Sequence, residues 1–251
     1  MRGVPLSGVQ RRALARDLPV REQRPARGHG ERGMTAFDVL AWIALALAVA
    51  SAAFIVWETW GRGNRLQMSV MEVVWPVTAL YLGPVAVWAW RRWRTPRGEG
   101  MQDRPLPTAA ALAVGHCGAG CTLGDIVGSS LVFLLGLELA GLALWPELAV
   151  DFVLAFSLGV LFQYRTIAPM RGLGLRDGLV AALKADTLSL LAFEVGLFAW
   201  MILVQLVLFP GGLHPDEAAF WFMMQVGMIL GFITAYPVNW WLVRAGIKER
   251  M

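Results

Sequence analysis

Residues 36–57, AFDVLAWIALALAVASAAFIVW, determine the class of this protein. The stretch holds one acid, Asp38, near its start, and it is as long as the roughly 20 residues that cross the hydrocarbon core of a bilayer. It therefore predicts a transmembrane helix. The whole chain agrees, because its 251 residues are 57% hydrophobic and 16% charged, whereas soluble domains carry about a quarter charged residues.

Further apolar stretches, separated by Pro, Gly or charged residues, predict further spans. They are residues 70–90, 122–142, 148–164, 188–209 and 218–243, and the span at 148–164 is the shortest. We therefore predict an all-α fold, a polytopic integral membrane helical bundle of about six transmembrane helices. Before the fifth span, residues 172–186 have the apolar spacing of an amphipathic helix. This segment forms either a short helix on the membrane surface or a continuation of the fifth span.

Basic residues predict how the spans are oriented, since short cytoplasmic loops hold the excess of Lys and Arg. The bases gather in the N-terminal tail, in the loops at 91–104 and 165–184, and at the C-terminal end. This pattern predicts that both ends lie in the cytoplasm (N-in/C-in). Only Arg62 and Arg65, between the first two predicted spans, do not follow it.

The same reasoning assigns a compartment and partners. A multi-pass chain of this kind is expected in the bacterial inner (plasma) membrane, with the lipid bilayer as its partner. The sequence pI of about 9.6 follows from the basic loops that topology requires. No nucleic-acid-binding module accompanies this charge, so we expect no nucleic acid partner.

Three regions follow from the distribution of apolar and polar residues. Residues 1–33 are rich in Arg and Gly without apolar periodicity, which predicts a disordered basic tail. The tail is either an arm that touches anionic lipid or sequence upstream of a true start at Met34, which we favour. Residues 34–100 are expected to form an N-terminal transmembrane hairpin, and residues 101–251 a four-helix membrane domain.

Residues 115–125, GHCGAGCTLGD, contain both cysteines of the chain and are the strongest candidate for chemistry. On the cytoplasmic side these thiols would stay reduced. Thiolate and imidazole select soft or borderline metals such as Cu(I) and Zn(II). The predicted metal ligands are His116, Cys117, Cys121 and Asp125.

Helical geometry limits this hypothesis. In a continuous helix Cys117, Cys121 and Asp125 share one stripe, but His116 points well away from Cys121. A chelate that includes His116 therefore needs a break in the helix at residues 118–120, where glycines permit one. The alternative is that the glycines only let helices approach closely, with small buried cysteines among them.

Other polar and sulfur-containing residues in or near the spans suggest a sparse polar path across the bundle, because ionisable groups in hydrocarbon are costly unless paired or hydrated. Glu194 is the deepest carboxyl, and Arg165, Lys184 and Asp186 are expected to pair with Asp125 or with one another. Methionine sulfur is a ligand for Cu(I), although ordinary packing is the interpretation we favour for these methionines. The supporting residues are Arg165, Lys184, Asp186, Glu194, Asn239, Met223, Met224 and Met228.

Four short motifs carry a family resemblance. They are GHCGAGCTLGD at 115–125, FQYR at 162–165, KAD at 184–186 and YPVNWW at 236–241. Together they resemble a family of bacterial membrane proteins known as domain of unknown function number four-three-nine-six, over about Thr108 to Met251. The resemblance implies a four-helix membrane unit and supplies no reaction. In the predicted topology all four motifs meet on the cytoplasmic side, which suggests a single site there.

Three functions remain open. The leading hypothesis is a membrane protein that binds, and transports or delivers, a soft metal ion, Cu(I) or Zn. The second is a membrane dithiol redox protein, although C-x-x-x-C lacks the usual C-x-x-C spacing. The third is a non-catalytic module that docks an unidentified protein partner. We predict no catalytic residue and do not expect an enzyme, and without a Walker motif we expect no direct use of ATP.

Overall fold

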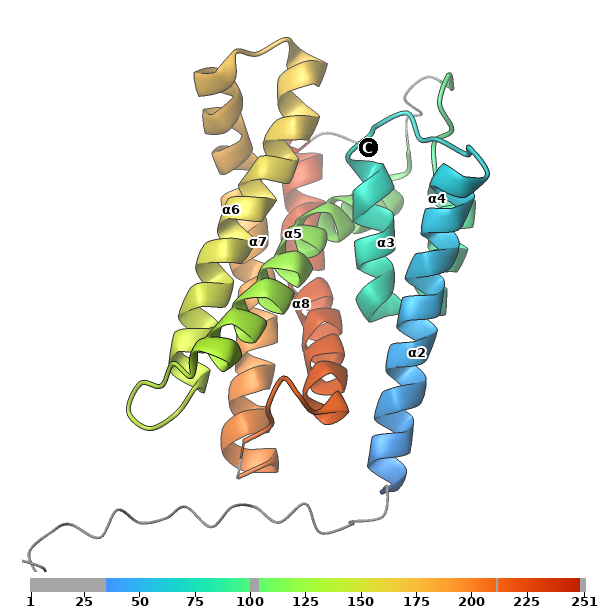
Figure 1. Cartoon of the computed structure of the whole chain (residues 1–251). Helices are drawn as coiled ribbons and strands as arrows, with labels where there is room; N and C mark the ends of the chain where they lie inside the picture. Colours follow the sequence, from blue (N-terminus) through green and yellow to red (C-terminus); the bar gives the residue numbers. More distant parts are fainter. Residues whose placement is uncertain (1–34, 100–103, 211, 249–251) are drawn as a thin grey trace, which may run out of the picture. The chain divides into compact units, whose positions relative to one another are not determined.

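The computed structural model describes residues 35–99, 104–210 and 212–248, and the regular elements there are helices joined by loops (Figure 1). This confirms the predicted all-α fold. The predicted tail at 1–33 and the domain boundary near residue 101 lie outside the described residues. In chain order the helices are α2 (Ala36–Val56), a short π-helix η1 (Trp57–Gly61), α3 (Met71–Leu82), α4 (Pro84–Trp93), α5 (Leu106–Leu135), α6 (Leu144–Arg171), α7 (Leu175–Leu203), a second π-helix η2 (Val204–Leu208) and α8 (Ala218–Arg244).

Five of the described helices are long and apolar enough to cross a membrane. They are α2 with η1, α5, α6, α7 with η2, and α8. Helix α6, with 28 residues, is much longer than the short span predicted at 148–164. Helix α7 begins at Leu175, so the amphipathic segment is mostly a continuation of the fifth predicted span and not a separate surface helix.

The stretch at 70–90 differs from the single span predicted there. Gly83 has φ +53° and Pro84 begins the next helix, so the stretch divides into α3 and α4. Helix α3 has 12 residues, about 18 Å, too short for the ~30 Å hydrocarbon core. The loop before α3 is also hydrogen-bonded to the loop after α4, since the Gln67 N–H donates to the Thr95 carbonyl at 2.9 Å. The two helices therefore form a hairpin that begins and ends at the same end of the bundle.

This hairpin changes the expected placement of the chain ends. At one end of the bundle, the ring of Phe37 at the start of α2 packs at a tilt against Phe209, just after α7 and η2. At the other end, Val243 near the close of α8 packs with Ala109 at the start of α5. The start of α2 and the end of α8 thus lie at opposite ends of the described helices (Figure 1). Five crossings would place them on opposite sides of the membrane, in contrast to the predicted N-in/C-in arrangement.

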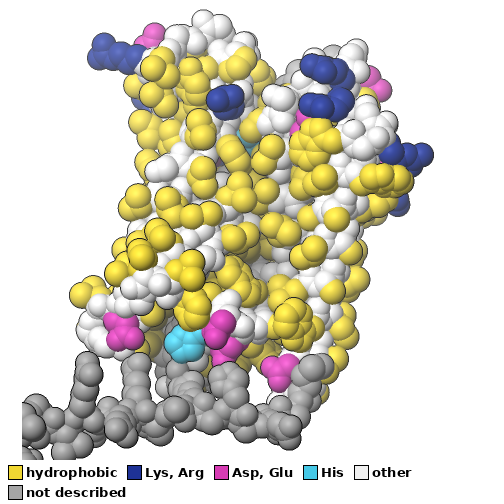
Figure 2. All heavy atoms as spheres, viewed as in Figure 1, with side chains coloured by type: hydrophobic (Ala, Val, Ile, Leu, Met, Phe, Trp, Pro, Cys, Tyr) yellow, Lys and Arg dark blue, Asp and Glu magenta, His cyan; other side chains and the backbone are white. Residues whose placement is uncertain are grey.

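Charge is distributed unevenly between the two ends. On the face in Figure 2, Lys and Arg side chains gather at the upper end, the lower end carries Asp, Glu and His, and hydrophobic side chains fill the region between them. Arg62 and Arg65, the exceptions to the predicted pattern, belong to the basic end because the α3–α4 hairpin returns there; the Arg97 N–H donates to the Arg65 carbonyl at 3.0 Å. The basic loops therefore share one end, as the positive-inside rule requires.

Helices α5 and α6 pack closely through a row of small residues. A Cβ atom placed on Gly120 would lie 2.8 Å from the Cα of Gly159, and one on Gly124 would overlap the backbone of Ala155. Small residues are what allow helix backbones to approach this closely inside a membrane. The glycines of α5 therefore serve helix packing, which was the alternative interpretation of the glycine-rich sequence.

We expect Gly124→Ala to destabilise the protein by about 1–3 kcal/mol, because the added methyl group meets the backbone of α6. Gly115→Ala is the matched control on the same helix, since its nearest neighbour, the Thr78 hydroxyl, is 3.6 Å from the new atom. Thermal denaturation of the two purified variants in detergent measures the difference. Equal melting temperatures would contradict the packing described here.

Cysteine labelling tests the arrangement of the ends. Ser69→Cys and Arg244→Cys are both exposed at the basic end, and Asp216→Cys is exposed at the opposite end. With a membrane-impermeant maleimide we expect the first two to react from one side of the membrane and the third from the other. The native cysteines are buried and should remain unlabelled. Labelling of Ser69→Cys from the same side as Asp216→Cys would show that residues 70–90 cross the membrane.

Candidate functional site

Both cysteines lie inside an unbroken helix. Helix α5 continues through residues 118–120, so the break that a chelate including His116 requires does not occur. Helical spacing puts Cys117, Cys121 and Asp125 on one stripe, and all three side chains have no exposed surface. The two thiols are free and lie close enough to interact with each other.

Glu194 of α7 faces this stripe. Its carboxyl lies beside the Cys121 thiol and interacts electrostatically with Asp125. Apart from the Cys121 thiol beside Glu194, no hydrogen-bond donor reaches the oxygens of Glu194 or Asp125 among the described residues. Two carboxyls and two thiols therefore share a closed interior position between α5 and α7.

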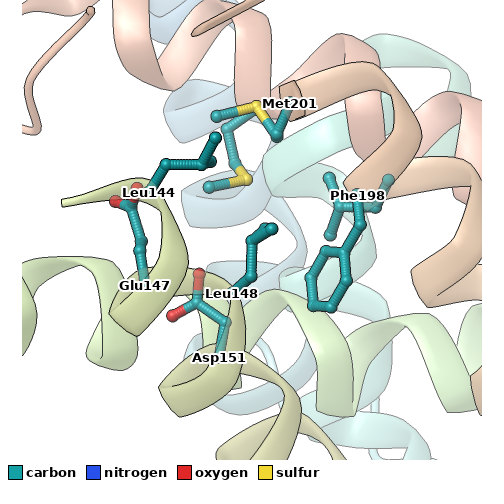
Figure 3. A pocket seen from close by; sticks show the side chains of 8 residues that line it. Leu144, Glu147, Leu148, Asp151, Phe198 and Met201 are labelled. Carbon is teal, nitrogen blue, oxygen red and sulfur yellow. The ribbon is translucent and has the colours of Figure 1, made fainter. Parts of the chain in front are cut away.

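Two further carboxyls extend the cluster along α6. Asp151 accepts a hydrogen bond of 2.9 Å from the Ser129 hydroxyl, and both Asp151 and Glu147 interact electrostatically with Asp125. Glu147 and Asp151 line a cavity of about 10 Å³, roughly the space of one water molecule. Figure 3 shows their carboxyl groups beside this cavity, with Met201 at its other side. We refer to Glu147, Asp151, Asp125 and Glu194 as the carboxyl file.

The carboxyl file has no basic partner in the part of the chain that the structure describes. The ion pairs found there join Glu58 to Arg62, Glu72 to Arg65, and Asp186 to Lys248. A buried carboxylate without a countercharge or hydrogen bonds is strongly disfavoured. Inside a membrane, such a carboxyl is stable only when it is protonated or lies next to a cation.

His116 does not belong to this cluster. Its Nε2 lies 3.3 Å from the Thr166 hydroxyl of α6, and its ring packs edge-on against Phe162. The Nδ1 atom has no partner. His116 therefore faces α6, as expected for a continuous α5, and not the stripe of the two thiols.

The family-like motifs are only partly brought together. Asp186 and Asn239 both bond to Lys248, at 3.0 Å and 2.9 Å. Arg165 and Lys184 are exposed, so neither pairs with Asp125 as predicted. The partner of Asp186 is instead a lysine that sequence reasoning had counted only among the basic C-terminal residues.

The three methionines of α8 are all buried, but they have different surroundings. The Met228 sulfur accepts a hydrogen bond from the Thr122 hydroxyl at 3.6 Å. Met224 lines the cavity beside Glu147 and Asp151. Met223 packs in the apolar core. Two of the three thus lie near the carboxyl file or the thiols.

Residues 35–99, 104–210 and 212–248 contain no group of three His, Cys, Asp or Glu side chains placed to hold a metal ion. The four predicted ligands accordingly do not form one chelate. Cys117, Cys121 and Asp125 remain together, with Glu194 in the position opposite them.

Sequence reasoning missed Glu147, Tyr81 and Lys248. Glu147 stands one helical turn before Asp151, and this spacing alone could have joined the two. Tyr81 of α3 interacts with both thiols, and no sequence signal places α3 beside α5.

Arg104, just outside the spans, connects the start of α5 to the loop after α4, because its guanidinium donates a hydrogen bond of 2.6 Å to the Thr95 hydroxyl. Burial lowers the pKa of this guanidinium.

These features define a helical, multi-pass membrane protein with a buried thiol and carboxyl cluster. The family described as "Domain of unknown function (DUF4396)" matches residues 108–248, and the chain belongs to it. This confirms the resemblance noted in the sequence. The matched region begins in α5 and includes the whole carboxyl file. No curated protein and no solved structure matches the chain.

We expect Glu194→Met to raise the stability of the protein by about 1–3 kcal/mol, because it removes a buried carboxyl that has no basic partner among the described residues and keeps the side-chain length. Glu72→Met is the matched control. Glu72 is equally buried but accepts bonds from Arg65 and from the Leu66 N–H, so its loss should destabilise by about 1–3 kcal/mol. Denaturant titration in mixed micelles measures both changes. A destabilised Glu194→Met would mean that the carboxyl has a stabilising partner.

Proposed function

We propose that this protein carries a soft or borderline metal ion across the bacterial inner membrane. The observation that carries the proposal is the carboxyl file, which has no basic partner among the described residues and leads to two buried thiols. A chain that places four acids in its interior without a countercharge offers binding positions to a cation. The thiols at the end of the file determine which cation fits.

The ligand chemistry favours zinc. Zn(II) accepts thiolate sulfur and carboxylate oxygen together, and Cys121 has Cys117, Glu194 and Asp125 as its neighbours. Cu(I) prefers sulfur alone, for which Met228 offers a further sulfur, since it contacts Thr122, the residue after Cys121. The proposal therefore retains Cys117, Cys121 and Asp125 as ligands and replaces His116 with Glu194. It requires these side chains to shift toward the ion when it binds, because the described residues hold no group of three already placed to coordinate a metal.

An ion in transit needs a different arrangement from a resident metal centre. Conduction requires binding that is favourable enough for entry and weak enough, spread over several positions, for release. The small cavity beside Glu147 and Asp151 suits an entrance, since it lies on α6 near the acidic end of the bundle. From there Asp151 interacts with Glu194, and Glu194 lies beside Cys121.

A second function is favoured by a different observation. Cys117 and Cys121 interact directly, and Thr122 lines an apolar cavity of about 120 Å³ that also includes Gln225. A hydrophobic acceptor of the quinone class could bind there. Disulfide formation would then transfer two electrons and two protons from the thiols to the acceptor, giving a quinol. Docking of a protein partner remains a prediction without a specific observation in its favour.

Zinc uptake into proteoliposomes, followed with an enclosed fluorescent indicator, tests the leading proposal. We expect Glu194→Gln and the double variant Cys117→Ser, Cys121→Ser to lower uptake at least about tenfold, because each removes ligands from the proposed path. Glu138→Gln is the control, since Glu138 is an exposed carboxyl in the loop after α5.

Uptake that is equal in wild type and in both site variants would overturn the transport proposal. If zinc uptake is absent but the thiols of wild type are oxidised by an added quinone, the redox function replaces it. Folding of each variant is checked by its melting temperature.

A further inference from the structure

Lys248 places an ammonium group inside the bundle. Its side chain has no exposed surface, and Nζ donates to Asp186 Oδ1 at 3.0 Å, Ser189 Oγ at 3.2 Å and Asn239 Oδ1 at 2.9 Å. All three donors of the ammonium group are thereby satisfied. The acceptors are oxygens of three kinds, a carboxylate, a hydroxyl and an amide, on α7 and α8.

The lysine reaches this position from outside the helices. Helix α8 ends at Arg244, and the chain then turns at Gly246, which has φ +69°. The N–H groups of Ile247 and Lys248 both donate to the Leu242 carbonyl, at 3.0 Å and 3.2 Å. This turn directs the Lys248 side chain back toward Asn239, which is the residue of α8 that belongs to the oxygen set.

The oxygens around Nζ form a cage, and all of them belong to side chains of α7 and α8. The Asn239 amide donates to the Ser189 hydroxyl at 2.7 Å and to the Ala235 carbonyl at 2.9 Å, which fixes its Oδ1 toward the cage. Asp186 has no exposed surface, and its second oxygen, Oδ2, has no partner. That oxygen lies beside Gly159, where a Cβ would approach it to 2.9 Å.

We propose that the cage of Asp186, Ser189 and Asn239 is a binding site for a monovalent alkali cation such as sodium, and that Lys248 fills it when the C-terminal turn is docked. Carboxylate, hydroxyl and amide oxygens are the ligands of hard cations. The unpartnered Asp186 oxygen supplies a fourth ligand that the ammonium group does not use. His116, whose ring packs against α6, is a further titratable side chain that interacts electrostatically with both Asp186 and Lys248.

A structural ion pair between Lys248 and Asp186 would make the same contacts as a lysine that fills a cation site. The two interpretations predict different results when the lysine is removed. Lys248→Met keeps the length of the side chain and removes its charge. A structural pair then leaves Asp186 without its partner and the protein destabilised in every salt. A cation site instead recovers stability when sodium occupies the cage, since a ligand that binds only the folded protein stabilises it by mass action.

The experiment compares melting temperatures of the purified full chain in sodium chloride and in choline chloride at equal ionic strength. We expect wild type to melt at the same temperature in both. Lys248→Met should melt several degrees lower than wild type in choline and regain most of the loss as sodium is titrated. The double variant Asp186→Asn, Lys248→Met is the control, and it should show no response to sodium.

The outcome remains decisive if Lys248→Met folds poorly. Its yield of monodisperse protein is then compared after extraction in sodium and in choline, and a higher yield in sodium supports the cage. Equal responses of the single and double variants, or equally low yields in both salts, overturn it. The inference stands apart from the metal path, because Cys117→Ser and Cys121→Ser introduced together with Lys248→Met should leave the response to sodium unchanged.

Discussion

The close approach of α5 and α6 is the constraint on which the interior of this protein depends. Because Gly120 and Gly124 let the two backbones meet, the neighbouring stripe of α5 is held at the centre of the bundle. The same absence of side chains makes room for charge. The Asp151 carboxyl occupies the space that a side chain at Gly128 would need, and Asp186 does the same at Gly159. Glycine therefore determines both the helix contact and the positions of two buried acids.

The sequence predicts those features that depend on one helix at a time. Apolar runs of about 20 residues identify the long spans, and a spacing of four places Cys117, Cys121 and Asp125 on one stripe. It also indicates that Glu194 is a deep carboxyl that requires an explanation. The contact between Glu194 and Cys121, by contrast, joins two residues of different helices that are 73 positions apart in the chain. Only the packing of α5 against α7 determines it.

The α3–α4 hairpin shows why topology is harder to predict. The pair Gly83-Pro84 is visible in the sequence, but a proline inside an apolar run is compatible with a kinked span as well as with a reversal. The reversal depends on the loops on either side, where Leu66 pairs with Pro96 across 30 residues. Counting this stretch as one span gives six predicted crossings, whereas five of the described helices are long and apolar enough to cross a membrane. The two anomalous arginines, Arg62 and Arg65, were the sequence evidence for this reversal.

Lys248 was beyond sequence reasoning for another reason. A lysine a few residues after the last helix is typical of a cytoplasmic end, and nothing in its local sequence distinguishes an inward side chain from an exposed one. Its position depends on the turn at Gly246 and on an oxygen set from α7 and α8. The expected partners of Asp186, Arg165 and Lys184, are exposed instead.

Among the buried acids of the described residues, Asp186 differs from Asp125 and Glu194 in a way that bears on function. Asp186 is matched by an ammonium group with three hydrogen bonds, so this chain can supply a countercharge to a buried acid. Asp125 and Glu194 lie in the same bundle with no basic partner among the described residues, and only the Cys121 thiol lies beside Glu194. Each such group costs about 1–3 kcal/mol, a large fraction of the roughly 5–15 kcal/mol that stabilises a typical fold. If the interior served only the stability of the fold, replacing these acids with apolar residues of similar volume would stabilise the protein. The stability of the fold therefore does not account for these acids beside two thiols, and this is the physical ground for proposing a cation that enters and leaves.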